Sequence, residues 1–399
     1  MEFEFVDSQR TAKIKVIGIG GAGNNAINNM IASGLQGPAF IAANTDLQDL
    51  ESSPASVKLQ LGAERTKGLG CGADPEIGRE AAQEDTETIK ELLSDTDMVF
   101  ITAGMGGGTG TGGAPVVAES LKELDRPPLV VAVVTKPFMF EGNRRLRQAE
   151  EGIARLKEHA DTIITIPNDR LMSMAPRGCS IREAFKMADD VLLQAVKGVS
   201  DLILLPGFIN VDFMDAQKVM SKRGQALMGT GIASGPDRAN MAAHQAIHSP
   251  LLEDISVKGA QGILINISAA EDNVSLDEVN DACTLVQKEA HPDADVIFGV
   301  AWDNSLGDCL RITVIATGIG NAEEKAVPAS EPQEDKVHLA SLDEVARNTR
   351  EFDRPTKERR SQTVRSLSDF ERPQYSKYES FIIDEEDLER PTFMRRKAD

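Results

Sequence analysis

Short, continuously apolar runs alternate with longer polar or amphipathic stretches through the first 170 residues of the chain. Each run fits a buried strand, and an alternation of such strands with helices indicates a parallel sheet that is covered on both faces. We therefore predict an α/β fold that begins with a Rossmann-like domain. The predicted strands are 14–20, 39–43, 98–103, 128–135 and 162–166, and the predicted helices are 24–30 with an Asn cap, 75–93, one whose first turn holds Pro115, and 141–159.

The next segment carries one long amphipathic stripe. Apolar residues recur at spacings of four and three, which is the period of a helix buried on one face. The pattern predicts a central helix over about 180–204, roughly 36 Å long at 1.5 Å per residue. Its first turn would lie near the carboxyl ends of the strands, and its last turn would deliver 206–215 far from them. The stripe consists of Ile181, Phe185, Ala188, Leu192, Ala195, Val199 and Leu202.

Beyond the central helix the pattern is mixed, and after Gly318 the composition becomes rich in Glu, Pro, Ser and Arg. Such a composition is typical of a disordered linker. Strands are expected at 226–229, 262–267, 296–300 and 310–316, with helices at 213–221, 237–247 and 275–289. The predicted organisation is an N-terminal extension (1–11), the Rossmann-like domain (12–179), the central helix (180–205), an α+β domain (206–318), a disordered linker (319–380) and a C-terminal peptide (381–399).

Two glycine loops follow predicted strands. Seven of the ten residues from Gly104 to Gly113 are glycine, and 18–23 satisfies G-x-G-x-x-G. A strand, a glycine loop and a helix together aim backbone N–H groups and a positive helix end at an anion. Asp46 lies about twenty positions beyond the first loop, where a dinucleotide fold places its ribose-binding acid. From these residues alone, a phosphate-binding fold and an NAD-binding domain both remain open.

Composition narrows the classes of function. The formal net charge is -20, and the first 320 residues contain no basic patch, so we expect no nucleic-acid binding. The four cysteines are scattered without metal-binding spacing, which predicts reduced thiols and no protein-bound metal site. No apolar run approaches the roughly 20 residues of a membrane span, and the acidic N-terminus contains no signal core. These features predict a soluble, cytoplasmic protein.

The sequence Gly-Gly-Gly-Thr-Gly-Thr-Gly at 106–112 resembles the signature of the tubulin/FtsZ family of GTPases. Other motifs agree with the bacterial cell-division branch of that family, and the likeness extends over about 12–318 and the last dozen residues. Together they are far more specific than a lone G-x-G-x-x-G. The agreeing motifs are 20–26 (GGAGNNA), 44–46 (NTD), 140–142 (FEG), 166–170 (IPNDR), 210–213 (NVDF) with Asp215, and 391–396 (PTFMRR).

The resemblance implies a role for each matching position. The cofactors would be GTP or GDP with Mg²⁺. A carboxylate accepts two N–H donors from guanine, and Phe185, one helical turn from Asp189, offers a stacking face. Taken singly, Phe185 also fits the core, Asn168 a turn and Arg145 a solvated charge. The implied nucleotide-binding residues are Gly20, Gly21, Gly23, Asn24, Gly107, Gly108, Thr109 and Gly110 around the phosphates, Glu141 and Arg145 at the ribose, and Asn168, Phe185 and Asp189 at the base.

The implied catalytic residues are Asn210, Asp212 and Asp215. They lie at the end of the central helix that faces away from the glycine loops. In the family this loop enters the nucleotide site of the next subunit, so the contact is head to tail and propagates as a filament. A structural alternative is that Asp212 caps the helix that follows it, which is compatible with catalysis.

The same resemblance implies partners and a location. We expect a homopolymer beneath the membrane at mid-cell, in the cytokinetic ring, with membrane-anchoring and regulatory division proteins bound through 388–399. On composition alone that tail fits a solvated segment equally well. Ala22, Met214 and Arg390 depart from the family pattern. Two other functions stay open: an NAD(P)-dependent oxidoreductase, and a structural polymer that binds nucleotide without hydrolysing it.

Overall fold

The computed structural model describes residues 12–319 except 177, 206, 223, 253–258 and 272. The predicted extension at 1–11, the C-terminal peptide and all but the first residue of the predicted linker lie outside the described residues. All of the described residues belong to one compact unit.

A single ten-stranded sheet runs through the described chain in the order β3-β2-β1-β4-β5-β6-β7-β10-β8-β9. Strands β1 to β6 are parallel, and β10 is antiparallel to both of its neighbours. The two halves of the sheet join where β6 and β7 pair over only two residue pairs. The strands are β1 Ile14–Ile19, β2 Ala39–Asn44, β3 Val57–Gln60, β4 Met98–Gly104, β5 Leu129–Lys136, β6 Thr162–Pro167, β7 Gln225–Ser234, β8 Gly262–Ala269, β9 Asp295–Trp302 and β10 Cys309–Ile319.

Helices cover both faces of the parallel half. Apolar residues of α1 and α9 form one core with the sheet, and those of α5, α6 and α7 form the other. Helices α11 and α12 pack on the second half, which has a core of its own. The helices are α1 Gly20–Ala32, α2 Leu47–Ser52, α3 Ala63–Thr66, α4 Pro75–Glu84, α5 Thr86–Leu93, α6 Thr109–Lys122, α7 Asn143–His159, α8 Asn168–Met174, α9 Ile181–Leu204, α10 Phe213–Met220, α11 Arg238–Ile247 and α12 Leu276–Glu289.

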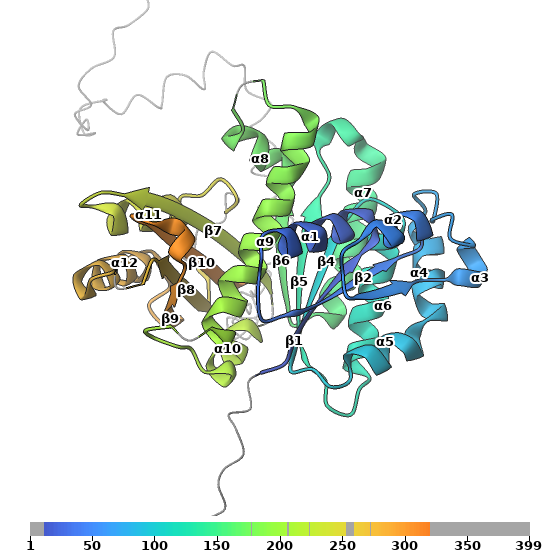
Figure 1. Ribbon diagram of the computed structural model, residues 1–399, viewed down its shortest axis with the longest axis horizontal. Helices are drawn as coiled ribbons and strands as arrows, with labels where there is room; N and C mark the ends of the chain where they lie inside the picture. Colours follow the sequence, from blue (N-terminus) through green and yellow to red (C-terminus); the bar gives the residue numbers. More distant parts are fainter. Residues whose placement is uncertain are drawn as a thin grey trace, which may run out of the picture. The chain divides into compact units, whose positions relative to one another are not determined.

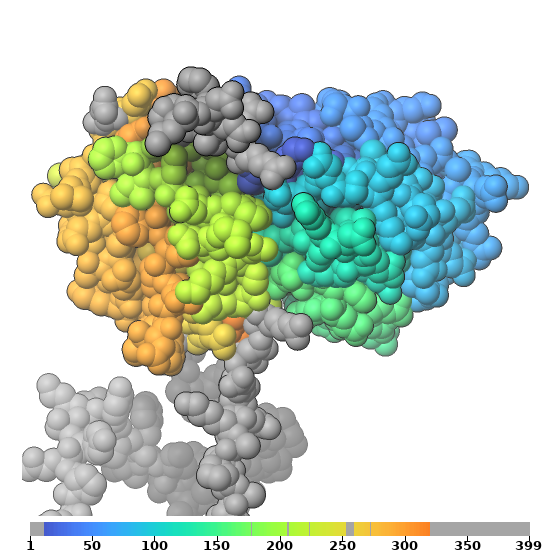
Figure 2. Space-filling model, turned by 90° about the horizontal axis from the view of Figure 1, so that it is seen from below, coloured from blue at the N-terminus to red at the C-terminus, as the bar shows by residue number. Residues whose placement is uncertain are grey.

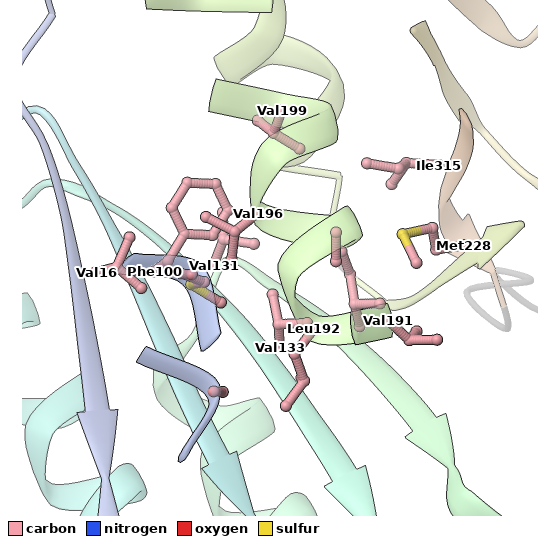
Figure 3. Close-up of a cluster of buried hydrophobic side chains, with 14 of the residues drawn as sticks. Val16, Phe100, Val131, Val133, Val191, Leu192, Val196, Val199, Met228 and Ile315 are labelled. Carbon is pink, nitrogen blue, oxygen red and sulfur yellow. The ribbon is translucent and has the colours of Figure 1, made fainter. Parts of the chain in front are cut away.

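Helix α9 stands between the two halves of the sheet (Figure 1). Its valines and leucines pack against Phe100 and Val131 on one side, while Met228 and Ile315 lie on its other side (Figure 3). Seen from below, the segments before α9 occupy one side of the surface and those after it the other (Figure 2). The predicted stripe is buried from Ala188 onward, but Ile181 is 70% exposed. The first turn of α9 therefore projects beyond the core.

Several helix starts differ from the sequence prediction. Helix α1 begins at Gly20, so Asn24 lies inside the helix and does not cap it. Helix α6 begins at Thr109, inside the glycine loop, so Pro115 lies in the helix interior and not in its first turn. The predicted helix over 75–93 is two helices that break at Asp85, and the sequence pattern does not predict α8 at all.

Candidate functional site

A pocket of about 280 Å³ opens at the carboxyl ends of β1, β4, β5 and β6. In a parallel sheet this edge is where ligands bind. Eleven of the thirteen residues predicted to bind nucleotide line the pocket, although they come from six separate segments. These eleven are Gly20, Gly21, Gly107, Gly108, Thr109, Gly110, Glu141, Arg145, Asn168, Phe185 and Asp189.

The two glycine loops face each other across one end of the pocket. Gly20 has a φ of +75°, and a Cβ there would lie 3.0 Å from the backbone nitrogen of Gly110. Both loops open helices, α1 and α6, whose N-cap residues make no side-chain capping bond. The first backbone N–H groups of each helix are therefore left to a ligand, and both positive helix ends favour an anion. This end of the pocket suits phosphate.

Gly23 and Asn24 are the two predicted residues that do not line the pocket. A Cβ at Gly23 would lie 2.5 Å from the carbonyl oxygen of Thr102, so this glycine lets α1 approach β4. Asn24 is fully buried, and neither of its side-chain amide atoms has a partner within the described residues. A buried amide without a partner costs about 1–3 kcal/mol. Such a group fits a bound anion or water beside the first glycine loop.

The side of the pocket carries an ion pair. Nη1 of Arg145 lies 2.6 Å from Oε2 of Glu141. The other oxygen of Glu141 accepts a hydrogen bond from the backbone N–H of Phe138 at 2.9 Å. The Glu141 carboxylate is therefore held in place, and it holds the Arg145 guanidinium beside the pocket. A guanidinium with donors still available can bind a phosphate or a sugar hydroxyl.

The opposite end of the pocket combines an aromatic face with polar groups. Phe185 is 41% exposed and meets Phe138 edge to face, with ring centroids 5.3 Å apart. Asn168, the first residue of α8, is 4% exposed, and its Oδ1 has no partner within the described residues. An unpartnered amide beside an aromatic face is suited to a planar, hydrogen-bonding ring such as a base.

Asp189 lies one helical turn beyond Phe185 and also lines the pocket. Burial, and secondarily the negative charge of Asp190, raises the pKa of its carboxyl to about 7. Carboxyls perturbed in this way are common in ligand sites, because a ligand can supply the donors that the protein does not. Two N–H donors of a bound base would stabilise the ionised form.

Asn210, Asp212 and Asp215 lie beyond the other end of α9, and the structure does not bring them to the pocket. Oδ1 of Asn210 accepts the backbone N–H of Gly207 at 2.7 Å, which shapes the turn before α10. Asp212 is the N-cap residue of α10, but its side chain makes no capping bond. Asp212 and Asp215 are both exposed. The capping alternative is therefore not seen, and both carboxylates face solvent.

Sequence reasoning missed several residues that complete the pocket. Thr135 and Pro137 lie at the end of β5, and Ala188 and Leu192 are on the pocket side of α9. The rule that ligands sit at carboxyl strand ends would have indicated Thr135. Among the described residues, no group of three or more His, Cys, Asp or Glu is arranged to hold a metal ion. The described helices include none with the length and apolarity that crossing a membrane requires.

Comparison with known proteins agrees with this geometry. Residues 13–176 match the family model for the Tubulin/FtsZ family GTPase domain, and 224–320 match the FtsZ family C-terminal domain. The chain is 49% identical over 370 residues to the Cell division protein FtsZ of Azotobacter vinelandii, covering 91% of this chain and 93% of that protein.

Solved structures agree as well. An empty FtsZ dimer of M. jannaschii matches with a TM-score of 0.74 and 45% identity, covering 78% of this chain and 89% of that one. CetZ1 from Haloferax volcanii, a GDP-bound monomer, matches with a TM-score of 0.67 and 20% identity, covering 77% and 95%, which shows a common fold. The oxidoreductase alternative receives no support from any of these relatives.

Proposed function

The chain belongs to the tubulin/FtsZ family of GTPases, in its FtsZ cell-division branch. From this premise we propose which parts of the chain bind GTP, which join the subunits and which hydrolyse GTP. The pocket binds GTP, subunits join head to tail into filaments, and GTP is hydrolysed only where the Asp212 loop of one subunit meets the pocket of the next. The filaments form the cytokinetic ring. The observation that carries the proposal is the separation of the pocket from the exposed carboxylates by the length of α9.

That separation is large compared with the reach of a side chain. Helix α9 has 24 residues and so spans roughly 36 Å. Phe185 and Asp189 lie near its first turns, whereas Asp212 follows its last turn by eight residues. A carboxylate must come within hydrogen-bond distance of the attacking water to position it. A second copy of the chain would supply that carboxylate.

Exposed apolar side chains at the two ends of the molecule support the head-to-tail contact. The pocket-end patch is the set of exposed apolar residues in 139–140, in α8 and in the first turn of α9, which are next in sequence to pocket residues, and the loop-end patch is the pair on either side of Asp212. Apolar residues that gather on one exposed surface are typical of surfaces that bind a partner. Two different patches on one subunit form a heterologous contact, which grows into a filament. The pocket-end patch consists of Met139, Phe140, Met172, Met174 and Ile181, and the loop-end patch of Phe208 and Met214.

The remaining parts of the proposal rest on the family. Mg²⁺ would be held mainly by phosphate oxygens and water, as is usual for this ion at nucleotide sites. The protein would act in the cytoplasm at mid-cell, beneath the membrane. Segment 388–399 would bind the membrane-anchoring and regulatory division proteins. Its deletion should abolish partner binding but leave GTP turnover intact, and a lower turnover would contradict a role limited to docking.

A complementation experiment tests catalysis across the interface. Asp212→Ala keeps the pocket but removes the carboxylate. Gly107→Glu keeps the Asp212 carboxylate but blocks the pocket. No atom lies within 4 Å of a Cβ built at Gly107, so the new side chain fits without strain, and its negative charge would repel phosphate. Each variant alone should lose GTP turnover. A mixture should regain it, because the pocket of the first variant can meet the loop of the second in about one in four random contacts.

The control is the double variant Asp212→Ala/Gly107→Glu, which should rescue neither partner. For the native chain, turnover per subunit should rise steeply with protein concentration, measured by phosphate release and light scattering. A mixture that stays inactive while Asp212→Ala still binds GTP and assembles would overturn catalysis by the neighbouring loop. Native filaments that bind GTP without turnover would instead support the structural-polymer alternative.

A further inference from the structure

Three small polar side chains form a closed cluster beneath the second glycine loop. The hydroxyl oxygens of Thr45 and Thr109 lie 2.7 Å apart. The thiol of Cys71 donates to Oγ1 of Thr45 at 3.3 Å, and the hydroxyl of Thr109 donates to Sγ of Cys71 at 3.5 Å. Thr45 is fully buried, and Cys71 is 5% exposed. Only Thr109 also lines the pocket.

The surrounding backbone fixes this cluster in place. The carbonyl of Thr45 accepts hydrogen bonds from the backbone N–H of Gly70 and the hydroxyl of Thr66, both at 3.2 Å. A Cβ at Gly108 would lie only 2.6 Å from Cβ of Cys71, so the thiol-bearing loop is pressed against the glycine loop. The surrounding backbone therefore holds the three side chains close together.

The number of hydrogens that each group can donate decides which group donates to which in this cluster. A hydroxyl has one hydrogen to donate, and a thiol has one weaker one. Without an anion, the three groups close a ring in which each donates once and accepts once. When Thr109 turns its hydrogen toward an anion, it can still accept from Thr45, and Thr45 can still accept from Cys71. The thiol is then the terminal donor of a chain that ends on the anion, and each bond polarises the next.

We propose that Cys71 and Thr45 are positioning residues that direct the Thr109 hydroxyl toward a phosphate group of the bound nucleotide. This inference rests on the proposed GTP site and adds to it the means by which that hydroxyl is oriented. Neither positioning residue lines the pocket. Removing the thiol proton allows the Thr45 hydroxyl to rotate away from Thr109. The Thr109 hydroxyl then loses the donor that holds it aimed at the phosphate.

The test measures the dissociation constant for GTP by equilibrium dialysis, below the concentration at which subunits assemble. Cys71→Ala should weaken GTP binding two- to tenfold, which is the range for one hydrogen bond. Cys71→Ser restores a donor and should recover most of that loss. Thr45→Val, which keeps the shape but not the hydroxyl, should weaken binding at least as much as Cys71→Ala, and Thr45→Ser should recover it.

Two controls separate positioning from a general packing effect. Cys283→Ala removes another buried thiol, on α12 in the second half of the chain, and should not change GTP affinity. In a Thr109→Val background, Cys71→Ala should change affinity less than twofold, because the chain acts only through Thr109. Thermal unfolding of every variant checks that it is folded.

The inference is overturned if Cys71→Ala and Thr45→Val bind GTP like the native chain. It is also overturned if Cys71→Ala costs as much in the Thr109→Val background as alone. Failure of the proposed function is a different result, in which the native chain itself does not bind GTP.

Discussion

The pKa of Asp189 makes nucleotide affinity depend on pH in a defined direction. Its carboxyl titrates near pH 7 in the ligand-free protein because of burial and of Asp190. In the proposed site only the ionised carboxylate accepts two N–H donors from guanine. About nine tenths of the free protein is ionised at pH 8, and about one tenth at pH 6. GTP should therefore bind about tenfold more weakly at pH 6 than at pH 8.

The assay is GTP binding by isothermal titration calorimetry from pH 6 to pH 8, below the assembly concentration. Near pH 7, binding should release about half a proton per site, which two buffers of different ionisation enthalpy would reveal. The ligand-free protein should show the opposite trend in stability. The folded state binds the Asp189 proton more tightly than the unfolded state, so the free energy of unfolding should fall as pH rises from about 4 to 7.

Asp189→Asn is the matched control, because it keeps the shape of the side chain and removes the titration. It should bind GTP about 10- to 100-fold more weakly at pH 8, since it loses a charge-assisted hydrogen bond. Any pH dependence from the phosphates of GTP should remain in this variant. Its amide should also favour a xanthine base, which replaces one guanine donor with a carbonyl acceptor. Equal pH dependence in the native chain and in Asp189→Asn would refute the assignment of Asp189 to the base.

Three further predictions concern packing, charge and assembly. Gly112→Ala should destabilise the fold by about 3 kcal/mol in urea unfolding, because its Cβ would lie 2.0 Å from a carbonyl oxygen of α4; an unchanged midpoint would contradict that close approach. Asp303→Asn should cost about 2 kcal/mol in the same assay, because it leaves Lys197 and Arg311 without their shared carboxylate; salt should not restore the loss. Phe208→Ser should raise the critical concentration for light scattering and leave GTP affinity intact; assembly at the native concentration would remove the loop-end patch from the contact.

Strand β3 was not predicted, because only Leu59 of its four residues is buried. The other five strands of the parallel half could be predicted because they are largely buried on both faces. Their sequences are continuously apolar, so their positions follow from the runs of apolar residues along the chain. The start of α6 could not be predicted in this way. Glycine and threonine disfavour a helix interior, and the helix begins at Thr109 because tertiary packing overrides that preference. A Cβ at Gly112 or Gly78 would meet backbone at 2.0 or 2.4 Å, which shows how closely α4 and α6 approach.

The pocket could be located from the sequence, but not all of its details could. The glycine loops and the strand-end residues define its rim, and the structure brings them together. The apolar periodicity of α9 predicts that Phe185 is buried, but its side chain is 41% exposed. The glycine motif predicted that Gly23 binds phosphate, but in the structure Gly23 packs against β4 and does not line the pocket. The burial that raises the pKa of Asp189 is a property of the assembled pocket, so the sequence does not contain it directly.

The arrangement of the parts gives a physical reason for coupling hydrolysis to assembly. The positive ends of α1 and α6 and the glycine loops can bind a triphosphate without any contribution from the far end of α9. In the proposal, catalysis needs in addition the carboxylates that follow α9, and these cannot reach the pocket of their own chain. A lone subunit would then hold GTP intact, and contact with a neighbour would supply the missing groups. Hydrolysis would thus be confined to the filament.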